Sequence, residues 1–275
     1  MSHFITLIKT EYLKRKHAYW MPVWIIAGIA AIVLIVSVTA AIVHWEEIQI
    51  GFLNMAFDYE DIQDGVKVGA FGTLAFMAFI FFIFMLINVQ SSLSKEKELG
   101  CELFYRCQPV NIWTCTASRY LMHVFAGAVL LLGLGILVAL VTSVVSAFTV
   151  GGFYPGSALM GALLGVIIYL KLCLVFGSLY FFFSSVFRNN AFIKGTAVLG
   201  IIELLFYLIE ELLRNTVSLP NIFSGLIGLA GNFNVDSGLT LADVLGDYRL
   251  IIAFLFAGAC YAGGTLIYKY KTSEA

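Results

Sequence analysis

Apolar residues gather in long runs that are separated by shorter polar segments. A membrane-spanning helix needs about 20 apolar residues, each of which advances it by about 1.5 Å. Six segments of the chain meet this requirement. We therefore expect six transmembrane helices, at residues 21–43, 68–89, 120–150, 157–187, 191–213 and 250–268.

The third and fourth of these helices share one uninterrupted apolar region. From Tyr120 to Leu170 the chain carries no charged residue apart from His123, which can be neutral. Such a region is too long for one helix. The sequence Gly-Gly-Phe-Tyr-Pro-Gly at residues 151–156 predicts a turn, because Gly and Pro interrupt helices.

Composition supports a membrane protein. Of the 275 residues, 61% are hydrophobic and 12% are charged, and the mean hydropathy is +0.94. A soluble domain has about 25% charged residues, so this chain has too little polar surface to coat a globule. The net charge of -1 gives no indication of nucleic-acid binding. The sequence predicts an all-α integral membrane protein with a single domain.

Basic residues indicate the orientation. Most of the 16 Lys and Arg residues lie before the first predicted span, between spans two and three, between spans four and five, or after span six. Short cytosolic loops carry an excess of Lys and Arg. Both termini are therefore predicted to be cytosolic, which requires an even number of spans. The expected location is the plasma membrane, as the inner membrane of a bacterium.

The first residues have a helical pattern. Four apolar residues fall on one arc of a helix, and Lys9 and Lys16 lie at its edge; the four are Phe4, Ile5, Ile8 and Tyr12. Such a helix lies in the plane of the headgroups, so we expect an interfacial helix at about 3–17. Glu11 and Arg15 interrupt the apolar arc. The alternative is an ordinary basic flank before a first span.

The last extracytoplasmic loop, 214–248, is the longest on its side. It contains two partly apolar stretches, 220–229 and 239–245, that are too short to cross a bilayer. Two short re-entrant helices fit this pattern, because irregular backbone at membrane depth must be shielded from lipid by protein. A simple loop packed on the surface is the alternative.

The cytosolic segment 91–119 carries charges of both signs, followed by a flexible joint at Gly100. Residues 101–107 can form about two helical turns, which Pro109 ends. A short helix with exposed acids and an apolar side chain is typical of a docking element for a soluble partner. A plain loop is the alternative.

These residues also carry a family resemblance. The run Glu96–Leu103, followed by Pro109-Val110 and Arg119, resembles the cytosolic coupling loop of ABC-2 type permeases, or type V exporters. The N-terminal surface helix, six spans, long final outer loop and basic C-terminal tail resemble that family over essentially the whole chain. The sequence departs from the family where Cys101 replaces the usual Thr and Asn111 the usual Ser.

The resemblance implies a function. Such permeases pair as dimers with a second copy or a paralogue, and each docks a nucleotide-binding ATPase subunit through this loop. By position, the residues that would contact the ATPase are Glu96, Glu98, Gly100, Glu102 and Phe104. The chain has no Gly-x-x-x-x-Gly-Lys-Ser/Thr run of its own. Magnesium-bound ATP would therefore be held by the partner, and this chain would be neither an enzyme nor a cofactor carrier.

Two ionisable residues lie within predicted spans, Lys171 in the fourth and Glu203 in the fifth. A charge at the centre of a span costs about 2.5–3.5 kcal/mol on insertion scales, so it normally faces the protein interior. Their depths differ by about 7 Å along a straight helix. We predict an ion pair between them, either as a buried packing contact or as part of the translocation path.

A weaker signal is the Gly-x-x-x-Gly run formed by Gly161 and Gly165, which permits a close approach between helices. The four His residues are scattered, and neither a metal-binding spacing nor a catalytic constellation is visible. The apolar bundle favours export of an amphipathic or lipid-like substrate. The alternative is an ATP-independent secondary transporter or channel, although we see no repeat between the two halves.

Overall fold

The computed structural model describes residues 2–43, 59–98, 111–149, 151–212, 221–230 and 245–270. Every regular element in these ranges is a helix. The elements are α1 (Ser2–Val43), α3 (Tyr59–Glu98), α5 (Ile112–Thr149), α6 (Pro155–Leu172), the π-helical η1 (Cys173–Gly177), α7 (Ser178–Val186), α8 (Ala191–Leu212), α9 (Ile222–Ala230) and α11 (Arg249–Tyr270).

Within the described ranges, five helices are long and apolar enough to cross a membrane. They are Ile62–Ser94, Ile112–Phe148, Pro155–Val186, Ala191–Leu212 and Arg249–Tyr270. Each contains, or nearly coincides with, one of the predicted spans. The prediction of a multi-pass helical membrane protein is confirmed at this level, and the first predicted span, 21–43, lies within α1.

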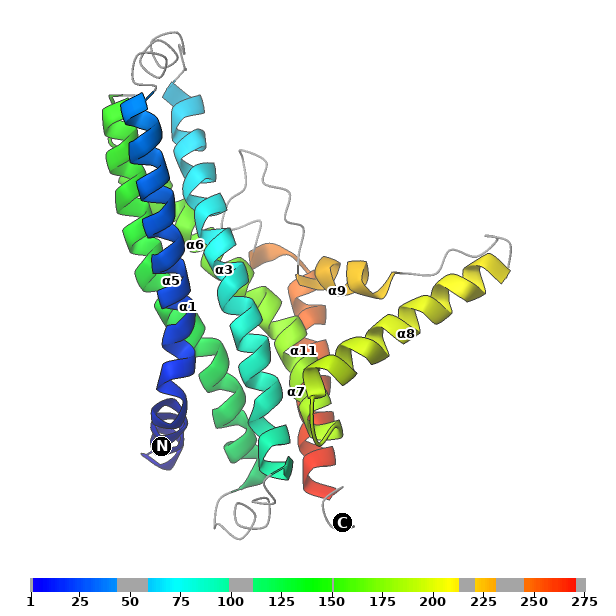
Figure 1. Cartoon of the computed structure of the whole chain (residues 1–275). Coiled ribbons are helices and arrows are strands. Elements are labelled where there is room, and N and C mark those ends of the chain that lie inside the picture. The colour runs from blue at the N-terminus through cyan, green and yellow to red at the C-terminus, as the bar shows by residue number, and fades with distance from the viewer. Residues whose placement is uncertain are drawn as a thin grey trace.

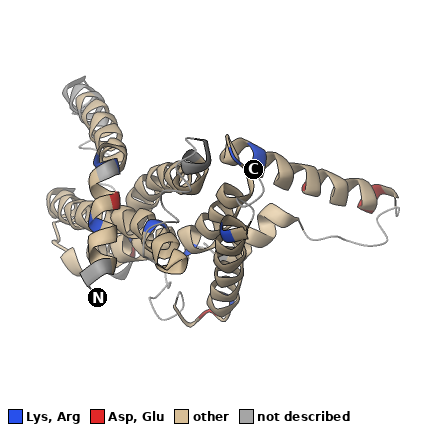
Figure 2. Ribbon diagram, turned by 90° about the horizontal axis from the view of Figure 1, so that it is seen from below, with Lys and Arg blue, Asp and Glu red and all other residues tan. Residues whose placement is uncertain are grey.

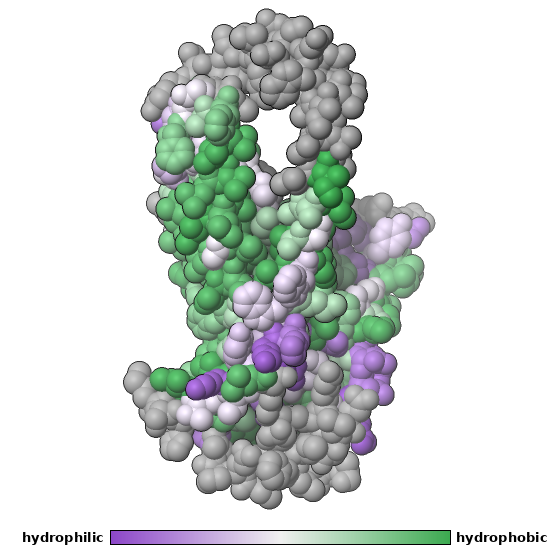
Figure 3. All heavy atoms as spheres, turned by 60° about the vertical axis from the view of Figure 1, so that its left-hand side comes forward, coloured by the Kyte–Doolittle hydropathy of each residue, from purple (hydrophilic) through white to green (hydrophobic). Residues whose placement is uncertain are grey.

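The helices form an upright bundle with one divergent member. In Figure 1, α1, α3 and α5 stand side by side, and α6, η1 and α7 continue one another through the middle. The start of α1, the end of α3, the start of α5 and the end of α11 lie toward the same end (Figure 1). Lys and Arg residues lie beside both termini in the view from that end (Figure 2). Apolar residues cover the middle of the upright helices, and hydrophilic ones gather toward the lower end (Figure 3).

The N-terminal helix is one element where two were predicted. Residues 3–17 and 21–43 belong to the single helix α1, which contains Pro22. The N-terminal part of α1, dark blue in Figure 1, turns out of the line of the rest. Proline bends a helix because it lacks an N–H donor and its ring clashes with the preceding turn. The helix therefore changes direction without ending.

The Gly-x-x-x-Gly run lies at a close contact between α6 and α3. A Cβ atom at Gly161 would overlap the backbone carbonyl oxygen of Lys67 in α3. A Cβ atom at Gly165 would lie 3.1 Å from Cδ2 of Leu74, which is fully buried. The packing seam that these glycines predicted is thus confirmed, and it joins α6 to α3.

The predicted turn between spans three and four is also confirmed. Gly151 has a φ of +76°, which favours glycine, and Pro155 occupies the first turn of α6. Proline is tolerated there because its missing N–H would have no partner within the helix. The following span differs from an ordinary helix, because five of its residues form the π-helical segment η1. No sequence signal indicated that segment.

The fifth span, α8, diverges from the bundle. It runs sideways in Figure 1, and its buried residues are confined to its first half, at Ala191, Gly195 and Leu199. The short helix α9 follows it in the chain and contacts α11, η1 and α6. This helix occupies the first of the two predicted re-entrant stretches. The second stretch, 239–245, lies almost entirely outside the described residues.

Candidate functional site

Both ends of the predicted coupling segment, 91–119, belong to long helices. Residues 91–98 continue α3, and residues from Ile112 onward belong to α5. The side chain of Asn111 caps α5, because its Oδ1 accepts a 3.0 Å hydrogen bond from the N–H of Trp113. Glu96 and Glu98 lie in the last turn of α3. Gly100, Glu102 and Phe104 lie outside the described residues.

Arg15 connects α1 to the C-terminal part of α3. Its Nη1 donates to the Ser91 hydroxyl at 2.7 Å and to the Asn88 carbonyl oxygen at 3.3 Å. Its Nη2 lies 3.4 Å from the Ser91 carbonyl oxygen. A guanidinium group has five N–H donors, so one arginine can contact several acceptors of a neighbouring helix. Arg15 thus holds α1 against α3, about two helical turns before α3 ends at Glu98.

Glu11 makes the corresponding connection to α5. Its Oε1 lies 3.8 Å from Nε of Arg119, whose side chain is only 3% exposed. Glu11 and Arg15 are the two residues that interrupted the apolar arc in the sequence. Both face other helices of the protein, which explains why they are polar at positions where the arc required apolar residues. An ion pair out of water needs close partners, because desolvation of each charge is costly.

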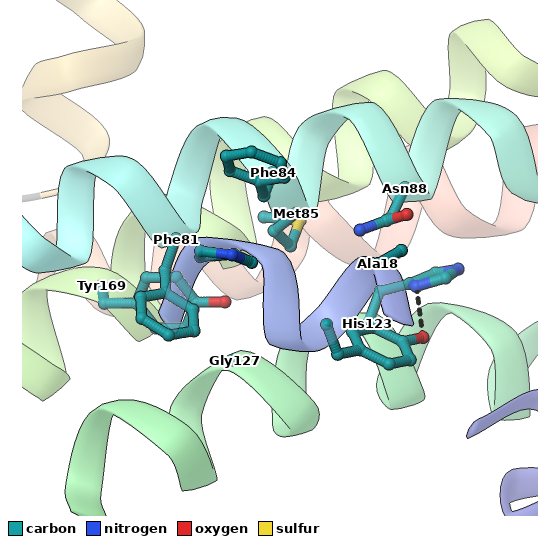
Figure 4. Close-up of a pocket in the computed structure, with 10 residues that line it drawn as sticks. Ala18, Phe81, Phe84, Met85, Asn88, His123, Gly127 and Tyr169 are labelled. Carbon is teal, nitrogen blue, oxygen red and sulfur yellow. Dashed lines mark hydrogen bonds between the residues drawn. The ribbon is translucent and has the colours of Figure 1, made fainter. Parts of the chain in front are cut away.

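A hydrogen bond between Tyr19 and His123 lies one to two turns further along α1 and α5. The Tyr19 hydroxyl lies 2.8 Å from Nδ1 of His123, and both side chains are buried. Figure 4 shows this pair at the edge of a small space that also contacts Asn88 and Tyr169. The space measures about 10 Å³, which is about enough for one water molecule. This place is therefore a helix junction and not a ligand pocket.

We refer to these residues together as the junction cluster. Its members are Glu11, Arg15, Tyr19, Ser91, Arg119 and His123. The cluster lies where α1 crosses α3 and α5, the two helices that flank residues 99–110. α1 therefore contacts both of these helices. The sequence did not predict that these residues lie together. It gave two indications, the charged residues in the apolar arc of α1 and the isolated His123.

The two ionisable residues within the spans have different partners. The Oε2 atom of Glu203 accepts a 2.8 Å hydrogen bond from the N–H of Ile222, the first residue of α9. A carboxylate is favourable there, because the first N–H groups of a helix are unsatisfied and its N-terminus is partly positive. Lys171 instead has Asp247 as its electrostatic neighbour. The carboxylate of Glu203 thus contacts the start of α9, and its ion pair with Lys171 stays a prediction.

Lys171 lines an apolar cavity. The cavity measures about 360 Å³. Its walls come from α5, from α6 with η1, and from the start of α11. The lining residues are Tyr120, Leu121, Val124, Phe125, Ile167, Leu170, Lys171, Leu174, Leu245, Leu250 and Phe254. Lys171 is the only charged side chain among them.

The π-helical segment shapes one wall of this cavity. η1 begins two residues after Lys171, and its member Leu174 lines the cavity. The Tyr120 hydroxyl, which belongs to the opposite wall, donates a 3.1 Å hydrogen bond to the carbonyl oxygen of Cys173. Single π turns within α-helices occur frequently at functional sites. The sequence indicated Lys171 as an unusual residue, whereas the cavity itself arises from three segments distant in the chain.

Comparison with the models of known protein families, with curated proteins and with solved structures finds no match for this chain. The function must therefore be argued from its own residues. Those residues describe a multi-pass helical membrane protein with a polar helix junction toward one end and an apolar cavity around a buried lysine.

Proposed function

We propose that this chain is the membrane-embedded permease subunit of an ABC-2 type transporter, driven by an ATPase on a separate chain. The observation that carries the proposal is the run Glu96–Leu103 followed by Pro109-Val110, which begins in the last turn of α3 and precedes α5. The run combines alternating charges, a glycine joint and a short acidic and apolar stretch. Since the sequence has no phosphate-binding loop, magnesium-bound ATP would be held and hydrolysed by the partner.

The lengths of the flanking helices support a coupling role. α3 has 40 residues and α5 has 38, so each extends for about 60 Å at 1.5 Å per residue. The hydrocarbon core of a bilayer is only about 30 Å thick. Both helices therefore continue well outside it, and Glu96 and Glu98 lie at the far end of α3. A soluble ATPase that pushes on this end would move two rigid helices.

The junction cluster supports the same role. Arg15 contacts α3, and the Glu11–Arg119 pair joins α1 to the start of α5. A displacement of residues 99–110 would therefore reach α1 through buried polar contacts. We propose that residues 3–17 lie in the headgroup plane and move with the coupling segment, and that α1 supplies the sixth span.

The remaining parts of the proposal concern assembly and location. The chain would reside in the inner membrane of a bacterium with both termini in the cytoplasm. It would function as a dimer with a second copy or a paralogue. We propose that the large apolar side chains exposed on the divergent helix α8, such as Ile201, Leu204 and Tyr207, face lipid or the second chain. The proposed activity is the export of an amphipathic or lipid-like substrate.

Purification of the tagged chain from its own cells tests the docking proposal. We expect an ATPase with a Gly-x-x-x-x-Gly-Lys-Ser/Thr motif to copurify, and to be lost when Glu102→Arg reverses the charge of the segment. Glu47→Arg, in the predicted outer loop, is the matched control and should retain the ATPase. Substrate movement in vesicles that contain this chain alone, driven by an ion gradient, would favour a secondary transporter or channel instead.

A further inference from the structure

We propose that the cavity between α5 and α11 holds one hydrocarbon chain of a membrane lipid, and that it recognises this chain and not the head group. The inference goes beyond the proposed function, because it requires only that these helices stand in a bilayer. Both α5 and α11 are long and apolar enough to do so.

Hydrogen bonds join the two helices beside one end of the cavity. The Thr116 hydroxyl of α5 lies 2.9 Å from the hydroxyl of Tyr261 in α11. The Tyr261 hydroxyl also donates a 2.7 Å hydrogen bond to the carbonyl oxygen of Trp113. The cavity is lined by residues further along α5 and nearer the start of α11, among them Phe125 and Phe254. It therefore lies beyond the place where these hydrogen bonds hold the two helices together.

The walls present almost no polar group to a ligand. Of the eleven described residues that line the cavity, nine are Leu, Ile, Val or Phe. The tenth, Tyr120, donates its hydroxyl to the carbonyl oxygen of Cys173. The eleventh, Lys171, is buried and already interacts within the chain, so its ammonium does not require a ligand of opposite charge. Such a lining favours a hydrocarbon over a polar ligand, because a polar group buried without a partner is costly.

The cavity borders the surface that meets lipid. Two of its lining residues, Phe125 and Phe254, are exposed on the outside of the helices. The exposed apolar surface continues at Val129 on α5 and at Leu255 on α11. In a bilayer this surface faces hydrocarbon chains, so one of them can enter the cavity sideways.

The size of the cavity limits its occupant to one chain. Ligand pockets measure about 300–1,000 Å³, and this cavity, at about 360 Å³, lies near the lower end of that range. An empty cavity would deprive its walls of van der Waals contacts. Water needs about two to four polar partners, which these walls do not provide. A single hydrocarbon chain supplies the missing contacts and needs no polar partner.

Photolabelling of the purified chain in nanodiscs tests the site. The probe is a phosphatidylcholine with a diazirine in the middle of one acyl chain. Val124 and Val138 form a matched pair, because both are valines of α5 that are 9% and 8% exposed, and only Val124 lines the cavity. We expect about tenfold more label at Val124, because a carbene inserts only into groups that it contacts. Equal labelling of the two valines would overturn the site.

Exchange of the head group tests whether the chain alone is recognised. The same diazirine-bearing chain is placed on phosphatidylglycerol, which is anionic, and on diacylglycerol, which is uncharged. Both probes should label Val124 to the same extent as the phosphatidylcholine. Labelling that depends on the charge of the head group would overturn recognition of the chain alone.

Two substitutions test whether binding depends on the free volume. Leu174→Trp enlarges a side chain of the lining and should lower the ratio of label at Val124 to label at Val138 to about one. Val129→Trp, at an exposed position of α5 outside the lining, is the matched control and should leave the ratio unchanged. A misfolded chain would expose both valines, so it would raise both labels. An unchanged ratio in Leu174→Trp would contradict the proposal.

The lipid site and the permease proposal are tested separately, because the nanodiscs contain no ATPase. If Val124 is labelled while no ATPase copurifies with the chain, the lipid site stands and the permease proposal fails. If an ATPase copurifies while Val124 is labelled no more than Val138, the permease proposal stands and the lipid site is wrong.

Discussion

The hydroxyl of Tyr19 lies 2.8 Å from Nδ1 of His123, although the two residues are 104 positions apart in the chain. This buried contact joins α1 to α5 next to the place where Arg15 contacts α3. One helix thereby contacts both of the helices that lead into residues 99–110. In the proposed permease, any movement that an ATPase imposes on that segment would be shared by α1.

The Tyr19–His123 contact predicts a loss of stability in Tyr19→Phe. The variant keeps the ring and removes the hydroxyl, which leaves Nδ1 of His123 buried without this partner. We expect destabilisation by about 1–3 kcal/mol, measured as a lower midpoint of thermal unfolding in detergent. Tyr12→Phe is the matched control, because the Tyr12 hydroxyl makes only an exposed contact with Trp20. Equal midpoints for the two variants would contradict the prediction.

The Glu11–Arg119 pair predicts energetic coupling between α1 and α5. Glu11→Gln and Arg119→Met should each destabilise the protein, because each leaves the other charge in a mostly buried place. The double variant should lose about 0.5–3 kcal/mol less than the sum of the two single losses. A double-mutant cycle of unfolding free energies measures this difference. Strictly additive losses would show that the pair does not join the two helices.

The seam between α6 and α3 predicts opposite signs for two Gly→Ala substitutions. At Gly161 a Cβ atom would overlap the Lys67 carbonyl oxygen, so the helices must separate, at a cost of about 1–3 kcal/mol. At Gly133 in α5, nothing lies within 4 Å of the new atom. Ala there should be neutral or stabilise the helix by up to about 1 kcal/mol. Thermal midpoints of both variants test the seam, and a tolerated Gly161→Ala would refute it.

The contact between Glu203 and α9 predicts local opening in Glu203→Leu. That variant removes the acceptor of the Ile222 N–H, whereas Glu203→Gln keeps a side-chain oxygen at the same place. A loss of about 1.4 kcal/mol in the free energy of local opening corresponds to a tenfold change in its equilibrium constant. We expect amide exchange at the first residues of α9 to rise about tenfold in the Leu variant, within the range for an unsatisfied donor, and much less in the Gln variant. Identical exchange in both variants would rule out this role of Glu203.

Two engineered cysteines test the predicted orientation. Each is introduced singly into a variant in which the five native cysteines have been replaced. Gly156→Cys and Asn189→Cys lie at exposed positions on opposite predicted sides of the membrane. An impermeant maleimide should label Gly156→Cys on intact cells and Asn189→Cys only after permeabilisation. The reverse pattern would place residues 99–110 outside the cell and end the docking proposal.

The sequence by itself determined the membrane class, the positions of the apolar spans and the turn at 151–156. These features are local, since a bilayer demands runs of about 20 apolar residues and Gly and Pro interrupt helices. The seam at Gly161 and Gly165 was also readable, because small residues at this spacing permit close contact. The sequence did not show that α3 is the helix packed against this seam.

Only the tertiary structure decided which groups meet. Glu203 contacts the start of α9. Lys171 has Asp247 as a charged neighbour and lines a cavity formed by three distant segments. The two charged residues that interrupt the apolar arc of α1 face α3 and α5. Sequence spacing reports which residues share a face of one helix. The partner of a charge depends on how helices cross, and that is set by packing between segments far apart in the chain.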